Sequence, residues 1–295
     1  ITKLMKLDIQ GASEKSLRNF RLIYAKKGVY VYRCLCDGVP SGAKYFENVD
    51  DRREILNYRI LNENSIPAIK VIASGEATLV TDDVSSSSEW RLGILEDLND
   101  CEVAKCLAQW YFELHEKGET VSKLNSLYFE YDCITRENIE KLCSKIPEAS
   151  ELLQYVLLRF DKLHELIFKP SFTLTYNDFY WTNFVVRKDK QAAMMFDYNL
   201  LGKGYRYSDF HNVCWSLSKD AGEAFISEYK HLYVFKHESS RQSEELLEKQ
   251  IDDVASSLFS LIAAFEQEKF PQWAEHAKNE TLNGTLLSKV KRLLL

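Results

Sequence analysis

The chain has 295 residues, of which 45% are hydrophobic and 28% are charged, and its formal net charge is −6. This composition is typical of a globular protein with one large domain or two lobes. Lysine and arginine are scattered, with no basic stripe, and no apolar run approaches the roughly 20 residues of a bilayer span. We therefore expect neither nucleic acid nor a membrane as a partner.

The chain has seven cysteines, an odd number, and no pair has the C-x-x-C spacing of zinc or thioredoxin-type sites. This pattern favours a reduced, cytoplasmic protein. Cys34 and Cys36 are two residues apart on a predicted strand and so share one of its faces, where we expect them to be small core residues. The oligomeric state is left open by the sequence.

The first hundred residues are rich in β-branched and aromatic side chains. They predict strands over residues 21–25, 29–36, 43–46, 69–76 and 90–98. A helix is predicted over 48–67, with Asp50 as its N-cap and Pro67 just beyond its end. Together these elements predict a sheet of about five strands around one helix.

After Asp100 the pattern becomes helical. Apolar residues recur at helical spacing over residues 101–118, 147–168 and 243–270. The change in pattern predicts an α+β protein with two lobes: a small β-rich N-terminal lobe, residues 1–98, and a larger, mostly helical C-terminal lobe, residues 99–295.

The stretch LTYNDFYWTNFVV contains Asp178 and Asn183, and Asp197 follows at the end of the next apolar run. This spacing matches the kinase catalytic loop, in which the Asp accepts the substrate hydroxyl proton, the Asn holds a magnesium ion and the later Asp binds Mg²⁺. A single Asp at a strand end is more often a turn residue. The three residues together predict a phosphoryl-transfer site, because Mg²⁺ prefers hard oxygen ligands and offsets the charge that develops on the phosphoryl group.

The region around this motif resembles the aminoglycoside phosphotransferase and choline kinase family, relatives of the protein kinases. The family reads H-G-D-x-x-x-x-N, then I-D-[WFY], then a further Asp. This chain has Tyr176-Asn177-Asp178, Asn183, Phe196-Asp197-Tyr198 and Asp209. The resemblance implies a bilobal protein-kinase-like fold with Asp178 as the catalytic base and Asn183 and Asp197 as ligands of Mg²⁺. Asp209 would be a buried acceptor that braces the catalytic loop.

The resemblance extends to the predicted nucleotide-binding lobe. In such enzymes a lysine on the third strand binds the ATP phosphates and pairs with a helix glutamate. Lys44 is at the matching position, and Glu54 is the predicted partner. Residues 94–98 resemble the linker whose backbone binds adenine, through positions such as Glu96 and Leu98. ATP and Mg²⁺ are therefore the implied cofactors.

Two departures from the family pattern concern the loops. Tyr176-Asn177 replaces His-Gly before the base, and a hydroxyl-bearing aromatic is expected to brace the loop as that His does. The loop that would cover the nucleotide is poor in glycine, with only Gly28, so Lys26, Lys27 and backbone amides are candidate phosphate contacts.

The resulting functional hypothesis is an ATP-dependent phosphotransferase acting on a hydroxyl of a small molecule that is aminoglycoside-, choline- or sugar-like. An alternative is a catalytically weak or inactive kinase-like module that only binds nucleotide. A protein kinase is disfavoured, because no A-P-E segment follows Asp197 and Asp209 comes too soon for an activation loop.

Overall fold

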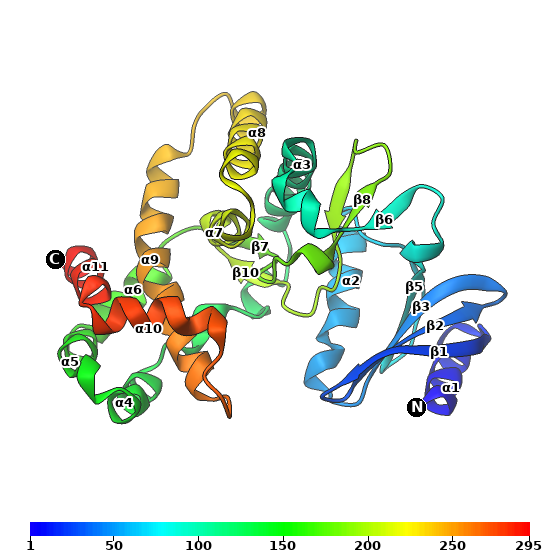
Figure 1. The fold of residues 1–295 in the computed structure, drawn as a ribbon, viewed down its shortest axis with the longest axis horizontal. Coiled ribbons are helices and arrows are strands. Elements are labelled where there is room, and N and C mark those ends of the chain that lie inside the picture. Colours follow the sequence, from blue (N-terminus) through cyan, green and yellow to red (C-terminus); the bar gives the residue numbers. More distant parts are fainter. The chain divides into compact units, whose positions relative to one another are not determined.

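The computed structural model describes all 295 residues, which divide into two compact units. Unit 1 comprises Ile1–Leu124, Leu174–Leu201 and Phe210–Ser240, and unit 2 comprises Asn125–Thr173, Gly202–Asp209 and Arg241–Leu295. The chain thus passes from one unit to the other several times (Figure 1). The predicted boundary between residues 98 and 99 falls inside unit 1 and stays a prediction.

Unit 1 contains a five-stranded antiparallel sheet in the order β1-β2-β3-β5-β4. Its strands are β1 (Leu17–Lys26), β2 (Val29–Cys36), β3 (Val39–Phe46), β4 (Val71–Ser74) and β5 (Thr78–Asp82). The number of strands agrees with the sequence, but the fifth strand is β5 and does not include residues 90–98. The prediction that residues 90–98 belong to this sheet is therefore wrong.

A helix that the sequence analysis did not predict, α1 (Thr2–Ser13), covers one face of this sheet (Figure 1). The core beneath it contains Met5, Ile9, Leu17, Cys34, Cys36, Ala43, Ala73 and Val80. The side chain of Asp8 accepts hydrogen bonds from the backbone N–H groups of Glu76 (2.8 Å) and Ala77 (3.0 Å), in the β4–β5 turn. This contact fixes α1 on the sheet, and we call the covered face the outer face.

The predicted helix over 48–67 is shorter than expected. Residues Asp50–Arg52 form a 3₁₀ turn, and the α-helix, α2, spans Arg53–Glu63 with Arg52 as its N-cap. The expected N-cap role of Asp50 is therefore wrong. The buried side of α2 includes the polar residues Glu54 and Asn57, which is unusual for a helix face that packs against other elements.

A second sheet of unit 1 has the order β6-β8-β9 and carries the catalytic-loop motif. Its strands are β6 (Trp90–Leu92), β8 (Phe184–Arg187) and β9 (Ala193–Met195). The helix α3 (Cys101–Gly118) has the predicted bounds and packs on β9 and on α8 (Lys219–His237). Between these helices His115 is fully buried, with its Nδ1 2.8 Å from the hydroxyl of Tyr229, as expected for a core histidine.

Five further elements precede α8 in the sequence. They are β7 (Thr173–Thr175), a 3₁₀ turn η7 (Trp181–Asn183), a 3₁₀ turn η3 (Leu95–Asn99), β10 (Gly202–Gly204) and α7 (Arg206–Ser216). Asp209 lies in the first turn of α7 and is 1% exposed. Its bracing of the catalytic loop stays a prediction.

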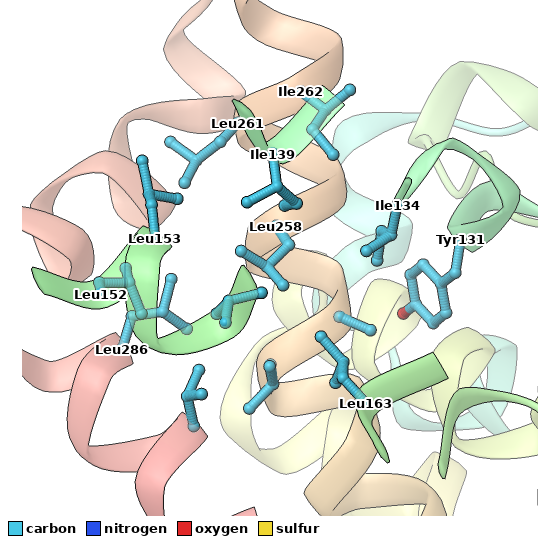
Figure 2. Packing of buried hydrophobic residues seen from close by; sticks show 14 of the residues in the cluster. Tyr131, Ile134, Ile139, Leu152, Leu153, Leu163, Leu258, Leu261, Ile262 and Leu286 are labelled. Atoms are coloured by element: carbon cyan, nitrogen blue, oxygen red, sulfur yellow. The ribbon is translucent and has the colours of Figure 1, made fainter. Parts of the chain in front are cut away.

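Unit 2 is mostly helical and has its own core (Figure 2). Its helices are α4 (Arg136–Lys145), α5 (Ser150–Leu158), α6 (Phe160–Ile167), α9 (Gln242–Phe265), α10 (Glu275–Leu282) and α11 (Thr285–Leu294). The helix predicted over 147–168 is interrupted at Arg159, so α5 and α6 are separate helices. Leu258, Leu261 and Ile262 of α9 belong to this cluster, with Leu258 near the middle of the side chains drawn in Figure 2. None of the helices combines the length and apolar character that crossing a bilayer requires.

The β-rich N-terminal region and the larger helical remainder confirm the predicted α+β class.

Candidate active site

Lys44 on β3 is the centre of an ion-pair cluster in unit 1. Its Nζ lies 2.6 Å from Oε2 of Glu54 and 2.9 Å from Oδ1 of Asp197. Burial alone lowers the pKa of this ammonium group, but the two carboxylates outweigh burial and the pKa is raised. Lys44 is therefore charged at neutral pH, and it joins β3 to the nearby helix α2 and to the distant segment that carries Asp197.

Glu54 lies on α2 and is 2% exposed. Burial raises the pKa of this carboxyl group to about 7, against the opposing effect of Lys44. The backbone N–H of Tyr198 also hydrogen-bonds to Glu54. The helix glutamate is thus tied both to Lys44 and to the segment that carries Asp197.

The sequence analysis missed a second anchor on α2. The side chain of Asn57 donates to the carbonyl oxygen of Tyr198 at 2.7 Å and is 4% exposed. Nearby, Tyr58 packs edge to face on the ring of Tyr198, with centroids 4.8 Å apart. Asn57 follows Glu54 by about one helical turn, so the two side chains share a helix face. A polar residue at this spacing was the only sign in the sequence that Asn57 has a role.

These contacts hold Asp197 in an unusual backbone conformation. Its φ is +62°, in the left-handed region that a residue with a Cβ rarely adopts. Such a conformation costs about 1–2 kcal/mol and persists only where the surroundings determine it. At Asp197 the surroundings are α2 and Lys44, which suggests that the direction of this carboxylate matters to the protein.

Asp178 and Asn183 contact each other directly. Nδ2 of Asn183 donates to Oδ2 of Asp178 at 3.1 Å and to its carbonyl oxygen at 3.2 Å. Burial, followed by the negative charge of Asp197, raises the pKa of Asp178 to about 6. A backbone hydrogen bond of 2.8 Å from Phe196 to Asn183 joins this loop to the strand end that precedes Asp197. The structure therefore brings Lys44, Glu54, Asp178, Asn183 and Asp197 into one connected network.

The two residues that replace His-Gly both have identifiable contacts. The hydroxyl of Tyr176 donates to the carbonyl oxygens of Phe196 (2.5 Å) and Asp197 (3.2 Å), and its ring is fully buried. Asn177 has a φ of +66°, the conformation in which glycine is favoured and Asn is the best-tolerated alternative. Its side chain donates to the carbonyl oxygen of Leu200 at 3.0 Å. Tyr176 therefore braces the loop, as the sequence predicts for a hydroxyl-bearing aromatic.

The predicted linker residues Glu96 and Leu98 lie in η3, a 3₁₀ turn, where an extended segment was expected. The side chain of Glu96 is exposed, and the carbonyl oxygen of Leu98 accepts a hydrogen bond from Ser218 at 2.9 Å. Their part in adenine binding stays a prediction. None of the hydrogen bonds described for Glu96 and Leu98 or for the Lys44 network connects these two residues to that network.

The residue that shapes this linker is Asp97, which the sequence analysis missed. It is 3% exposed and accepts two hydrogen bonds from Arg91, at 2.6 and 2.7 Å, and one from the backbone N–H of Ile94 at 2.9 Å. Gly93 precedes this turn, and a Cβ there would lie 2.4 Å from the carbonyl oxygen of Trp181. The linker therefore packs directly on the catalytic loop.

The residues of the network fit a magnesium ion. Asp197 and Asn183 offer a carboxylate and a carboxamide oxygen, which are ligands that Mg²⁺ accepts, with nucleotide phosphates supplying others. The charge of Asp197 disfavours ionisation of Asp178, and a cation would relieve this repulsion. No group of three or more His, Cys, Asp or Glu residues is arranged to hold a metal ion by itself.

The chain matches no protein-family model, and a comparison with curated protein sequences finds no relative. Its fold, in contrast, is similar to those of several solved structures. A choline kinase, LicA, from Streptococcus pneumoniae is 15% identical, with a TM-score of 0.62 over 97% of this chain and 99% of that chain. A putative fructosamine-3-kinase from Thermobifida fusca is 14% identical, with a TM-score of 0.63 over 97% and 98%.

A macrolide 2'-phosphotransferase from Brachybacterium faecium is 12% identical, with a TM-score of 0.59 over 96% of this chain and 97% of that chain. At such low identity these similarities establish the fold, and they confirm at that level the resemblance to the aminoglycoside phosphotransferase and choline kinase family. The chain has a protein-kinase-like α+β fold over nearly its whole length.

Proposed function

We propose that the protein is a small-molecule kinase that transfers the γ-phosphate of ATP to a hydroxyl group. The observation that carries this proposal is the ion pair of Lys44 with both Glu54 and Asp197, next to the contact between Asn183 and Asp178. Active protein-kinase-like enzymes need the lysine–glutamate pair and the metal-binding Asp in place together. The similar solved structures are small-molecule kinases and phosphotransferases, and one, a spectinomycin phosphotransferase, contains ADP and spectinomycin.

Each residue of the network has a distinct role in this proposal. Lys44 binds and orients the phosphates of ATP, and Glu54 orients Lys44. Asp197 and Asn183 hold Mg²⁺, which supplies positive charge to the transferring phosphoryl group. Asp178 accepts the proton of the acceptor hydroxyl, and with a pKa of about 6 its carboxylate is ionised at neutral pH. Positioning contributes more than base strength, because the transition state of phosphoryl transfer is loose.

The cellular setting is part of the proposal. All seven cysteines are free thiols, which is consistent with a reducing compartment, and we place the enzyme in the cytoplasm. The acceptor is a small molecule, with choline-, aminoglycoside- and sugar-like alcohols as the classes to test.

The decisive experiment measures ADP release with a panel of such acceptors in the presence of ATP and Mg²⁺. We expect turnover with at least one acceptor. Asp197→Ala should abolish turnover and weaken binding of Mg·ATP, whereas Asp178→Ala should lower kcat while nucleotide affinity stays close to wild type. Full turnover by the Asp178→Ala variant on a proven acceptor would refute the assigned role.

The alternative, a kinase-like module that binds nucleotide without transfer, is favoured by the glycine-poor hairpin between β1 and β2 and by Tyr176-Asn177 in place of His-Gly. It predicts nucleotide binding with no acceptor-dependent ADP release across the panel. Retention of Lys44, Asp178, Asn183 and Asp197 in one network argues for the active enzyme.

A further inference from the structure

The hairpin between β1 and β2 is too short to wrap around phosphates as a glycine-rich loop does. Lys27 and Gly28 alone connect the strands, with φ values of +50° and +82°, as in the primed turns that close two-residue hairpins. The side chain of Asn48 donates to the carbonyl oxygen of Lys27 at 3.1 Å. The backbone N–H of Glu47 donates to the carbonyl oxygen of Gly28 at 2.9 Å. The tip is therefore fixed to the end of β3.

Strand register shows which side chains of the hairpin lie on the same face as Lys44. Two rows of cross-strand neighbours run from β1 to β3, namely Lys26–Val29–Phe46 and Tyr24–Val31–Lys44. Side chains two residues apart on one strand share a face, so Lys26 is on the face of Lys44. We call this the inner face, opposite the outer face that α1 covers.

Ala25 belongs to the outer face. Its row is Ala25–Tyr30–Tyr45, and Tyr45 packs partly against the core under α1. The neighbouring residues Ala25 and Lys26 therefore have their side chains on opposite faces of the sheet. This property supplies a control for the experiment below.

The inner face beside Lys44 is open at β1. Tyr24 is 49% exposed, and the side chain of Lys26 is exposed as well. The Cα atoms of Lys26 and Lys44 are about 12 Å apart, because they are offset by two strand spacings across the sheet and by two residues along the strand. A lysine ammonium reaches about 6 Å from its Cα, so both groups can approach one polyphosphate chain.

We propose that Lys26 binds the terminal phosphates of the nucleotide from the hairpin, with its side-chain charge doing what backbone amides do in glycine-rich loops. This inference rests on the proposed function and deepens it, since the ligand is the polyphosphate of that same site. Because the tip is fixed to β3 through Asn48, the position of Lys26 relative to Lys44 is set before the ligand binds.

The test is titration calorimetry of ATP, ADP and AMP with Mg²⁺ at fixed ionic strength on the full-length protein. Lys26→Ala should weaken ATP binding on the order of tenfold, ADP binding less, and AMP binding not at all. Lys26→Arg should restore most of the affinity for ATP. The double variant Lys26→Ala, Ala25→Lys keeps the net charge of the hairpin but moves the cation to the outer face, and it should bind ATP as weakly as Lys26→Ala.

The outcomes separate this inference from the proposed function. If the wild-type protein binds no nucleotide, both are wrong. If it binds ATP and Lys26→Ala binds equally well, or if the relocated lysine restores affinity, only the inference is wrong. Circular dichroism spectra that match wild type for each variant establish that the hairpin is folded.

Discussion

Tyr176 offers a strict test of how the catalytic loop is held. Its hydroxyl donates to the carbonyl oxygens of Phe196 and Asp197, inside a fully buried environment. Tyr176→Phe keeps the ring and its packing on Trp110 and Tyr198 but removes this donor. Leaving a buried acceptor without its partner costs about 1–3 kcal/mol, and we expect the free energy of unfolding to fall by that amount.

The same substitution should also lower activity. Asp197 has a strained backbone, and the hydroxyl of Tyr176 is one of the contacts that determine it. Without it, the carboxylate samples other directions, and kcat/KM for Mg·ATP should fall at least about tenfold. Urea unfolding and steady-state kinetics of ADP release measure the two quantities.

A matched control is Tyr205→Phe in unit 2. The hydroxyl of Tyr205 donates to the carbonyl oxygen of Ile167 at 2.5 Å in an equally buried site, so the same atom is removed from a similar bond. This variant should lose a similar free energy of unfolding and keep its kinetic constants. If both variants lost activity in equal measure, or if Tyr176→Phe kept full activity, the positioning role of Tyr176 would be refuted.

Three further predictions address the same loop and its support. Asn177→Ala should lower the free energy of unfolding by about 1–2 kcal/mol, because its φ is +66°, whereas Asn177→Gly should lower it by less in urea titrations. Because burial and the charge of Asp197 raise the pKa of Asp178 to about 6, kcat/KM should fall about tenfold per pH unit below 6. The same shift makes this carboxyl group stabilise the fold below about pH 4, and that contribution is lost as the pH rises from 4 through 6. Asn57→Ala should lower the free energy of unfolding by about 1–3 kcal/mol, because the hydrogen bond from α2 to Tyr198 is lost. It should also weaken Mg·ATP binding in calorimetry, and unchanged nucleotide affinity would show that this contact of α2 does not support the site.

The parts of the site that are local in sequence were predictable. Asp178 and Asn183 belong to one loop next to β8, and Asp197 follows β9, the next strand of the same sheet, by two residues, so their spacing in the sequence carries the geometry. The bounds of α3 were predictable for a similar reason, because Asp100 caps its first turn and its apolar residues repeat at helical spacing.

The parts of the fold and of the site that depend on distant partners could not be predicted from the sequence. Residues 90–92 form a strand in either interpretation, but their partner β8 lies far along the chain, and local propensity does not specify a partner. The helix α1 buries only Met5 and Ile9 while Leu4 and Leu7 stay exposed, so its amphipathic pattern is weak. Asn57 looks like a solvent-facing residue until its partner Tyr198 is known.

The departures from the family motif replace contacts and do not remove them. At position 177, where the family pattern has glycine, Asn adopts a left-handed backbone and donates a hydrogen bond to Leu200. Where histidine is absent at position 176, a tyrosine hydroxyl joins the loop to the strand end before Asp197. The contacts that Tyr176 and Asn177 supply, together with the ion pair of Lys44 with Asp197, are what an active phosphotransferase would require of this loop.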